Sequence, residues 1–503
     1  MIRCKFSTAF WSSTGFVLLA VLVAAAYGPS LGHVARGDQI NYLAELSSRH
    51  GFVGTVLDTV DINRTRTFAP GDPIAFRPLL FFILGLEKYI FGYHFMGWQA
   101  VALLAHLFVC GALYALLCRI RGGLFAFLAT GMFALAPVNI EPVTWHHIMP
   151  YLLFAGCVLM ALRYLYAAEQ GDAKAGPHAA VGWMLPAVFL YEAGIWYALC
   201  MGAFLWLRGR RCAAYVMGAL VIFYIGVSAA DLFWRHAFDL LRTQQVSGQG
   251  SVFLTLTNMV LLGKWFLSAF FFLGSADLLP MTRMMVRPEV VGWAWPWGQT
   301  LSITIGMGLA ALTAVIAVFG QSVVRRGIGR NGAMVLLCFA MMAGNLAAIA
   351  VGRINAQGEF GMRVGLYYPY NFLVLALAAF ALALPRAAAK QALSEKSVKV
   401  FASCIIVALV ISYALAVHRV TAQMARDHRQ NRVFLAALDR YVKAHEKEPG
   451  FSFYIGPEYP GNYTADWVVR LGDPPGRPYT VAEALYFSQF TRNNPKYVIK
   501  FER

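Results

Sequence analysis

The chain has 503 residues, of which 59% are hydrophobic and only 13% are charged, and its mean hydropathy is +0.57. Apolar runs recur at lengths close to the roughly 20 residues that a helix needs to cross a bilayer, so the sequence predicts an integral membrane protein. The formal charge of +17 comes largely from arginines and lysines in short segments between the apolar runs. This placement is typical of cytoplasmic loops. We therefore expect membrane lipids, and no nucleic acid, among the partners.

The first apolar run, residues 14–31, leads into a long polar loop. We interpret the run as an uncleaved membrane helix, and the alternative is a cleavable signal peptide. Residues 53–60 place apolar side chains at i, i+3, i+4 and i+7, which predicts a helix lying on the membrane surface. Residues 76–92 predict a second interfacial helix, although Glu87 and Lys88 interrupt it. Residues 33–94 are thus expected to form the first extracytoplasmic loop.

Apolar runs separated by basic or polar turns predict the remaining spans. The predicted spans are residues 95–117, 124–136, 151–167, 213–230, 301–319, 333–351, 369–384 and 401–417.

Two further apolar runs are ambiguous in length or charge. The run 181–207 is too long for one comfortable span and carries Glu192 near its middle, so we predict a hairpin of two short helices with Glu192 at the outer apex. The run 253–273 contains Lys264, and we interpret it as a non-crossing or re-entrant helix. A single span at 181–207 combined with a true span at 253–273 gives the same topology downstream.

The predicted fold class is an all-α polytopic membrane protein with about 11 transmembrane helices. These helices occupy residues 1–417. Residues 418–503 are expected to form a small extracytoplasmic α+β domain, with a helix at 433–445 and a strand-like run at 497–501.

Two carboxylates stand at the outer ends of predicted helices. Asp38 follows the first helix and a glycine, and Glu141 lies in the short predicted loop between the spans 124–136 and 151–167. Either residue alone is explained by helix capping. Because adjacent helices bring the two loops together, the pair also predicts a site at the membrane surface.

Short ordered motifs connect these residues to a known family. The motifs are Phe76-Arg77-Pro78-Leu79, Phe91-Gly92-Tyr93-His94, His106, and Pro137 with Glu141, Val143 and Trp145. In this order they resemble the membrane part of the transmembrane and tetratricopeptide repeat O-mannosyltransferases and their bacterial relatives, which are glycosyltransferases of the C-type (GT-C) fold. More distantly, the chain is similar to protein O-mannosyltransferases and lipid A aminoarabinose transferases. The resemblance covers residues 30–210 and extends thinly to Glu359, Arg363, Tyr367 and Tyr368.

The resemblance implies a glycosyltransferase that takes a sugar from a polyprenyl-phosphate donor and transfers it to an extracytoplasmic acceptor. The acceptor hydroxyl must lose a proton as it attacks, and a positioned carboxylate contributes about 10²–10⁴-fold as general base. Asp38 is the expected base. Glu141 is expected to orient the acceptor, to hold Asp38, or to bind a divalent cation together with Asp38.

The departing phosphate needs positive charge rather than an acid, and a guanidinium suits it. Lys264, Arg353 and Arg363 are the expected phosphate-binding residues, and the alternative for each is a side chain that snorkels to the membrane surface. The other expected substrate-binding residues are Arg77, His94, Trp145, His146, Glu192 and Tyr367. His146 and His147 lack further ligands at zinc-site spacing, so no zinc site is expected.

Two other function classes remain open from the sequence. A secondary transporter would place ionisable residues near the bilayer midplane, whereas Asp38, Glu141 and Arg363 map to outer ends. A lipid-binding or assembly protein would keep the fold without catalysis and would tolerate the loss of Asp38. We expect the protein in a bacterial inner membrane with its site facing the periplasm.

Overall fold

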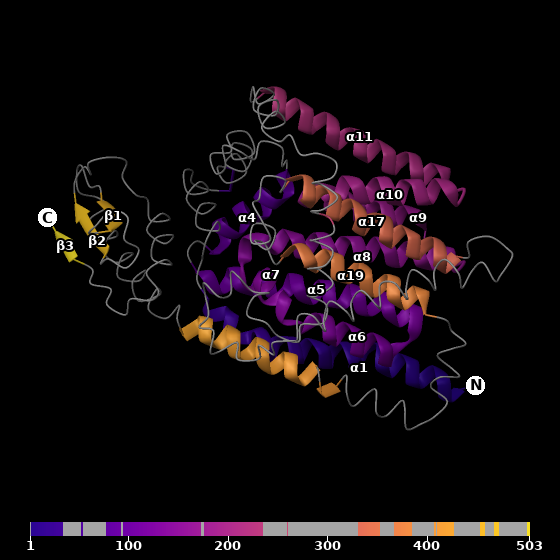
Figure 1. Ribbon diagram of the computed structural model, residues 1–503, viewed down its shortest axis with the longest axis horizontal. Helices are drawn as coiled ribbons and strands as arrows, with labels where there is room; N and C mark the ends of the chain where they lie inside the picture. Colours follow the sequence, from indigo (N-terminus) through magenta and orange to yellow (C-terminus); the bar gives the residue numbers. More distant parts are fainter. Residues whose placement is uncertain are drawn as a thin grey trace.

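The computed structural model describes a helical bundle and three short strands (Figure 1). The described residues are 2–33, 52–53, 77–91, 94–172, 176–234, 259, 330–352, 367–384, 407–408, 410–426, 453–457, 467–471 and 500–502. Four predicted segments lie outside this description, apart from Val53 and Met259: the non-crossing or re-entrant helix at 253–273, the span at 301–319, the surface helix at 53–60 and the helix at 433–445.

Each apolar run that falls within the described residues forms a helix. In chain order the first group is α1 (Ile2–Tyr27) with the 3₁₀ turn η1 (Gly28–Gly32), α4 (Pro78–Phe91), α5 (Phe95–Arg121), α6 (Gly123–Ala134), the short elements η2 (Pro137–Asn139), α7 (Ile140–Thr144) and η3 (His146–Ile148), and α8 (Met149–Glu169). The second group is α9 (Pro177–Leu190), α10 (Ala193–Leu207), α11 (Arg211–Trp234), α17 (Arg330–Gly352) and α19 (Tyr367–Ala383).

Four of the described helical segments are long and apolar enough to cross a membrane. They are Thr14–Gly32, Phe95–Arg121, Met149–Glu169 and Arg211–Ala230. Large apolar side chains on the outside of the bundle are exposed, as membrane-facing surfaces require; Val21, Ile222 and Phe223 are 59%, 73% and 60% exposed. The chain is therefore an integral membrane protein, as its composition predicts.

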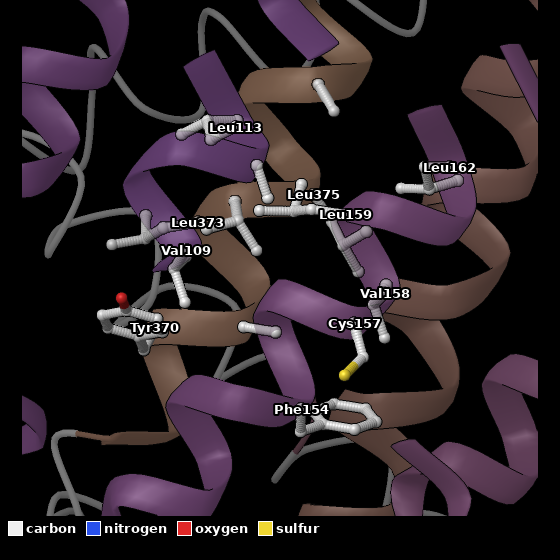
Figure 2. Packing of buried hydrophobic residues seen from close by; sticks show 14 of the residues in the cluster. Val109, Leu113, Phe154, Cys157, Val158, Leu159, Leu162, Tyr370, Leu373 and Leu375 are labelled. Atoms are coloured by element: carbon white, nitrogen blue, oxygen red, sulfur yellow. The ribbon is translucent and has the colours of Figure 1, made fainter. Parts of the chain in front are cut away.

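The interior of the bundle is built mainly by α5, α8 and α19. Figure 2 shows Val109 and Leu113 of α5, Phe154 and Leu159 of α8, and Leu373 of α19 gathered in one apolar cluster. All five side chains are nearly inaccessible. This packing fixes the three helices side by side, and it holds the ends of α5 and α8 that carry the polar residues described below.

The run 181–207 is a hairpin, as predicted. Helix α9 ends at Leu190, Tyr191 is extended, and α10 begins at Ala193. The two helices meet closely at the turn: a Cβ atom on Gly194 would lie 2.8 Å from the carbonyl oxygen of Ala187. Only glycine fits there without a shift of the backbone. Glu192 is therefore at the apex.

The loop predicted between α6 and α8 is instead a buried helical segment, which corrects the sequence interpretation. After α6 the chain passes through η2, α7 and η3, and every described side chain from Val138 to Ile148 is buried. Helix α6 has only 12 residues, about 18 Å at 1.5 Å per residue, whereas its neighbour α5 has 27. The space above the short helix is filled by the η2–α7–η3 segment.

The last predicted span ends later than residue 417. Residues 410–426 are helical, and Thr421 is buried against the end of α1, where its hydroxyl donates a hydrogen bond to the Ala26 carbonyl at 3.0 Å. His33 Nε2 donates to the Thr421 carbonyl at 3.0 Å. Within the predicted C-terminal domain, β1 (Phe453–Pro457) pairs antiparallel with β2 (Trp467–Leu471), and β2 pairs parallel with β3 (Lys500–Glu502).

Candidate functional site

Ion pairs lie at both ends of the bundle, and they identify the two ends. Among the residues that the structure describes, two pairs, Arg119–Asp172 and Arg208–Glu169, lie where α5, α8 and α10 end. We call this the basic end. Two other pairs, Arg77–Glu192 and Glu87–His146, lie where α8 begins and α9 ends. We call this the site end; α4 and α7 mark it in Figure 1.

The first pair at the site end joins the start of α4 to the apex of the α9–α10 hairpin. Arg77 Nε and Nη2 donate to the two carboxylate oxygens of Glu192 at 2.6 and 2.5 Å. The Arg77 guanidinium also lies over the rings of Tyr151 and Tyr191, 5.7 and 5.4 Å from their centroids. Burial alone would lower the pKa of Arg77, but the Glu192 carboxylate, together with Tyr151 and Tyr191, outweighs it and holds that pKa above its ordinary value. Arg77 and Glu192, two of the predicted substrate-binding residues, thus form an ion pair with each other.

The second pair is buried between α4 and η3. His146 Nε2 lies 2.7 Å from Glu87 Oε2, and the exposed fractions of the two side chains are 0% and 6%. The Trp98 indole meets the His146 ring edge-on, with the centroids 5.0 Å apart. Within the described part of the chain, His146 Nδ1 and Glu87 Oε1 have no hydrogen-bond partner. A buried polar atom left in this state costs about 1–3 kcal/mol.

The segment that carries Glu141, Trp145 and His146 is held by hydrogen bonds to α5 and α6. Gln99 Nε2 donates to the Thr144 carbonyl at 3.2 Å, and Asn139 Nδ2 donates to the Phe133 carbonyl at 2.5 Å. Glu141 and Trp145 are only 2% and 4% exposed. Glu141 is therefore a buried residue of α7 and does not lie at the tip of an exposed loop.

His106 is part of a separate polar cluster inside the bundle. Its Nε2–H donates to the Ala134 carbonyl at 3.0 Å, so its Nδ1 accepts from the Tyr370 hydroxyl at 2.7 Å. The Tyr27 ring lies edge-on to it at 5.4 Å. This packed, hydrogen-bonded arrangement is what we expect of a histidine within a membrane bundle. His94, which was expected to bind substrate, precedes α5 and is exposed, so it does not belong to this cluster.

Several predicted site residues lie outside the described residues. These are Asp38, Lys264, Arg353 and Arg363. Tyr367 is the first residue of α19, and its side chain lies outside the description as well. The structure thus brings Arg77, Glu141, Trp145, His146 and Glu192 to one end of the bundle, and the catalytic role of Asp38 stays a prediction.

Sequence reasoning missed Glu87 as a member of the site. It took Glu87 and Lys88 only as an interruption of an interfacial helix. A signal was present, because an ionisable residue inside an apolar segment is by itself a reason to look for a partner. The partner, His146, lies 59 residues away in the sequence, and only the folded structure identifies it.

The described residues contain no group of three or more histidine, cysteine, aspartate or glutamate side chains that would hold a metal ion. The divalent cation considered for Asp38 and Glu141 requires a residue outside that description and stays a prediction. Comparison with known proteins adds no family assignment: no protein-family model matches the chain, and a search of curated proteins finds no relative.

Proposed function

We propose that the chain is a membrane glycosyltransferase. It transfers a sugar from a polyprenyl-phosphate donor to an acceptor hydroxyl, with Asp38 as the general base. The observation that supports this most strongly is the collection of Arg77, Glu192, Glu87, His146 and Glu141 at one end of the bundle. A lipid-linked sugar presents its polar head at that depth, next to the membrane surface.

Chain connectivity limits how far Asp38 can lie from that end. His33, hydrogen-bonded to Thr421, ends the described part of the first helical segment at the site end. Asp38 follows five residues later, and five residues of extended chain span at most about 18 Å. This proximity favours a joint role for Asp38 and the site-end residues.

The proposed reaction is a displacement at the anomeric carbon. The acceptor oxygen forms a bond to that carbon as its proton passes to the Asp38 carboxylate. The bond between the anomeric carbon and the phosphate oxygen breaks, and the electron pair leaves with the polyprenyl phosphate. Phosphate is a weak base, so positive charge suffices at the leaving side. Because Glu192 occupies two donor groups of Arg77, we assign that role to Lys264, Arg353 and Arg363.

The basic end supports an orientation for the proposal. Arg119, Arg121, Arg208, Arg210 and Arg211 gather where α5 and α10 end and α11 begins. Arginine-rich short loops stay on the cytoplasmic side. The site end then faces the periplasm of a bacterial inner membrane, where polyprenyl-phosphate sugars are presented to external acceptors.

The test is mass spectrometry of polyprenyl-phosphate sugars and surface glycans. It compares cells that carry wild-type protein, no protein, or Asp38→Asn at equal expression. We expect the deletion and Asp38→Asn to lose the same sugar from the glycans while its lipid-linked donor accumulates. Asp172→Asn is the matched control, because it removes a carboxylate at the basic end. Wild-type glycans in the Asp38→Asn cells would remove Asp38 from catalysis and favour transport or a non-catalytic role.

A further inference from the structure

The buried Glu87–His146 pair is incompletely hydrogen-bonded. It joins only α4 and η3, and each partner keeps one polar atom, Glu87 Oε1 and His146 Nδ1, without a hydrogen bond among the described residues. Buried ion pairs are a weak source of stability even when all of their polar atoms are satisfied, and apolar residues of similar volume often do as well. Stability of the fold is therefore a poor explanation for this pair.

Three contacts position the His146 ring and the backbone next to it. Glu87 holds Nε2 of the imidazole, the Trp98 indole packs edge-on against the ring, and Gln99 fixes the Thr144 carbonyl two residues before His146. The ring is thus held in one orientation. Such an arrangement, in which a carboxylate positions an imidazole through one nitrogen, leaves the other nitrogen to interact with a ligand.

The hydrogen-bonding capacity of Glu87 Oε1 and His146 Nδ1 indicates which class of ligand they would bind. Glu87 Oε1 accepts hydrogen bonds when the carboxylate is ionised. His146 Nδ1 accepts in the neutral ring and donates in the imidazolium. A hydroxyl group donates and accepts, so it satisfies Nδ1 in both states. A ligand with several hydroxyl groups, rather than an anion or an apolar tail, matches the hydrogen-bonding chemistry of both atoms, which are buried.

We propose that Glu87 and His146 form a hydroxyl-binding subsite for the sugar, with His146 contacting a sugar hydroxyl and Glu87 positioning the imidazole. The proposal rests on the glycosyltransferase function proposed above and adds to it the place at which the sugar is recognised. It also separates two roles at the site end: the Glu87–His146 pair holds the sugar, and Asp38 accepts the proton.

The experiment measures transfer by full-length protein in lipid nanodiscs. Its probes are the lipid-linked donor extracted from the Asp38→Asn cells and bare polyprenyl phosphate as a competing inhibitor. His146→Gln keeps an amide near the position of Nε2, so that it still contacts Glu87, and it removes Nδ1. We expect the KM for the donor to rise about tenfold with kcat changed less than threefold, as for loss of one hydrogen bond to a charged or strongly polarised group. Inhibition by bare polyprenyl phosphate should stay unchanged, because that probe has no sugar.

Glu87→Gln and Arg119→Gln complete the set. Glu87→Gln should raise the same KM, because it weakens the positioning of the imidazole, whereas Arg119→Gln at the basic end should behave as wild type. A donor KM that stays at the wild-type value in His146→Gln would overturn the subsite while leaving the transferase intact. An equal rise in the inhibition constant of bare polyprenyl phosphate would also overturn it. If no donor accumulates in Asp38→Asn cells and the wild-type protein transfers no sugar, the proposed function itself has failed, and the subsite fails with it.

Discussion

Arg77 and Glu192, 115 residues apart in the chain, form a two-point ion pair that ties the start of α4 to the apex of the α9–α10 hairpin. The Arg77 side chain is 18% exposed and the Glu192 side chain 35% exposed, so the pair is only partly screened by solvent. It connects the end of the first polar loop of the chain to the turn between α9 and α10. Glu192 therefore serves as a partner between helices.

Removal of either partner should destabilise the protein, and the two losses should not add. Arg77→Met leaves the Glu192 carboxylate without its guanidinium, and Glu192→Gln removes the opposite charge. We expect a coupling free energy of about 1–3 kcal/mol between the two substitutions. Thermal unfolding in detergent of the wild type, the two single variants and the double variant measures it. Additive effects within about 0.5 kcal/mol would contradict an energetically coupled pair.

The close approach of the helices at the hairpin apex predicts that alanine substitutions at two glycines have different effects on stability. A Cβ atom on Gly194 would meet the backbone of Ala187 and Val188 at 2.8 Å, whereas one on Gly218 would meet nothing within 4 Å. Gly194→Ala should therefore lower stability by about 1–3 kcal/mol through overpacking. Gly218→Ala, the control, should be neutral or stabilising by up to about 1 kcal/mol, because alanine is the better helix former. Equal unfolding midpoints for the two variants would argue against the close approach.

The lowered pKa of Lys88 predicts that the stability of the folded protein rises with pH. Burial lowers the pKa of Lys88 to about 8 from an ordinary 10.5. Lys88 lies in α4, which is not one of the candidate membrane spans. Between these two pH values the unfolded chain holds a proton that the folded chain has released, so the free energy of unfolding increases with pH across that window.

Thermal midpoints measured from pH 7 to 10.5 test this expectation for Lys88. Lys88→Met should be more stable than wild type at pH 7 and should lack the contribution of Lys88 to the rise. Lys88→Arg is the control, because arginine keeps its charge throughout this range. Parallel curves for wild type and Lys88→Met would show that the pKa of Lys88 is not lowered in the folded protein.

In the His106 cluster, two substitutions should differ in how much they destabilise the protein, because one removes a single hydrogen bond and the other removes two. Tyr370→Phe removes one donor and leaves His106 Nδ1 without it, which should cost about 1 kcal/mol. His106→Leu removes both contacts of the ring and leaves the Ala134 carbonyl and the Tyr370 hydroxyl unsatisfied, so it should cost about 2–4 kcal/mol.

Both His106 cluster variants should keep the wild-type transfer rate per folded molecule if the role of His106 is structural. Unfolding midpoints together with the transfer assay decide this. A rate loss larger than the loss of folded protein would place His106 in the reaction.

The sequence by itself determined the membrane character of the chain and most of the described helices. Apolar length and composition are local properties, and a bilayer requires them of any crossing helix. The hairpin at 181–207 was predictable for the same reason: one charged residue, Glu192, divides a run that is too long for one span. The buried state of residues 138–148 was not predictable, because a short polar segment between apolar runs is usually a surface loop.

Only the tertiary structure decided which polar residues meet. Glu87 and His146 are 59 residues apart, and Arg77 and Glu192 are 115 residues apart. Sequence periodicity reports the face of one helix, not the helix that covers it. The short length of α6 leaves room for η2, α7 and η3 inside the bundle, which buries His146 against α4 and α5. The partners at the site end follow from that packing, whereas the helices themselves follow from the sequence.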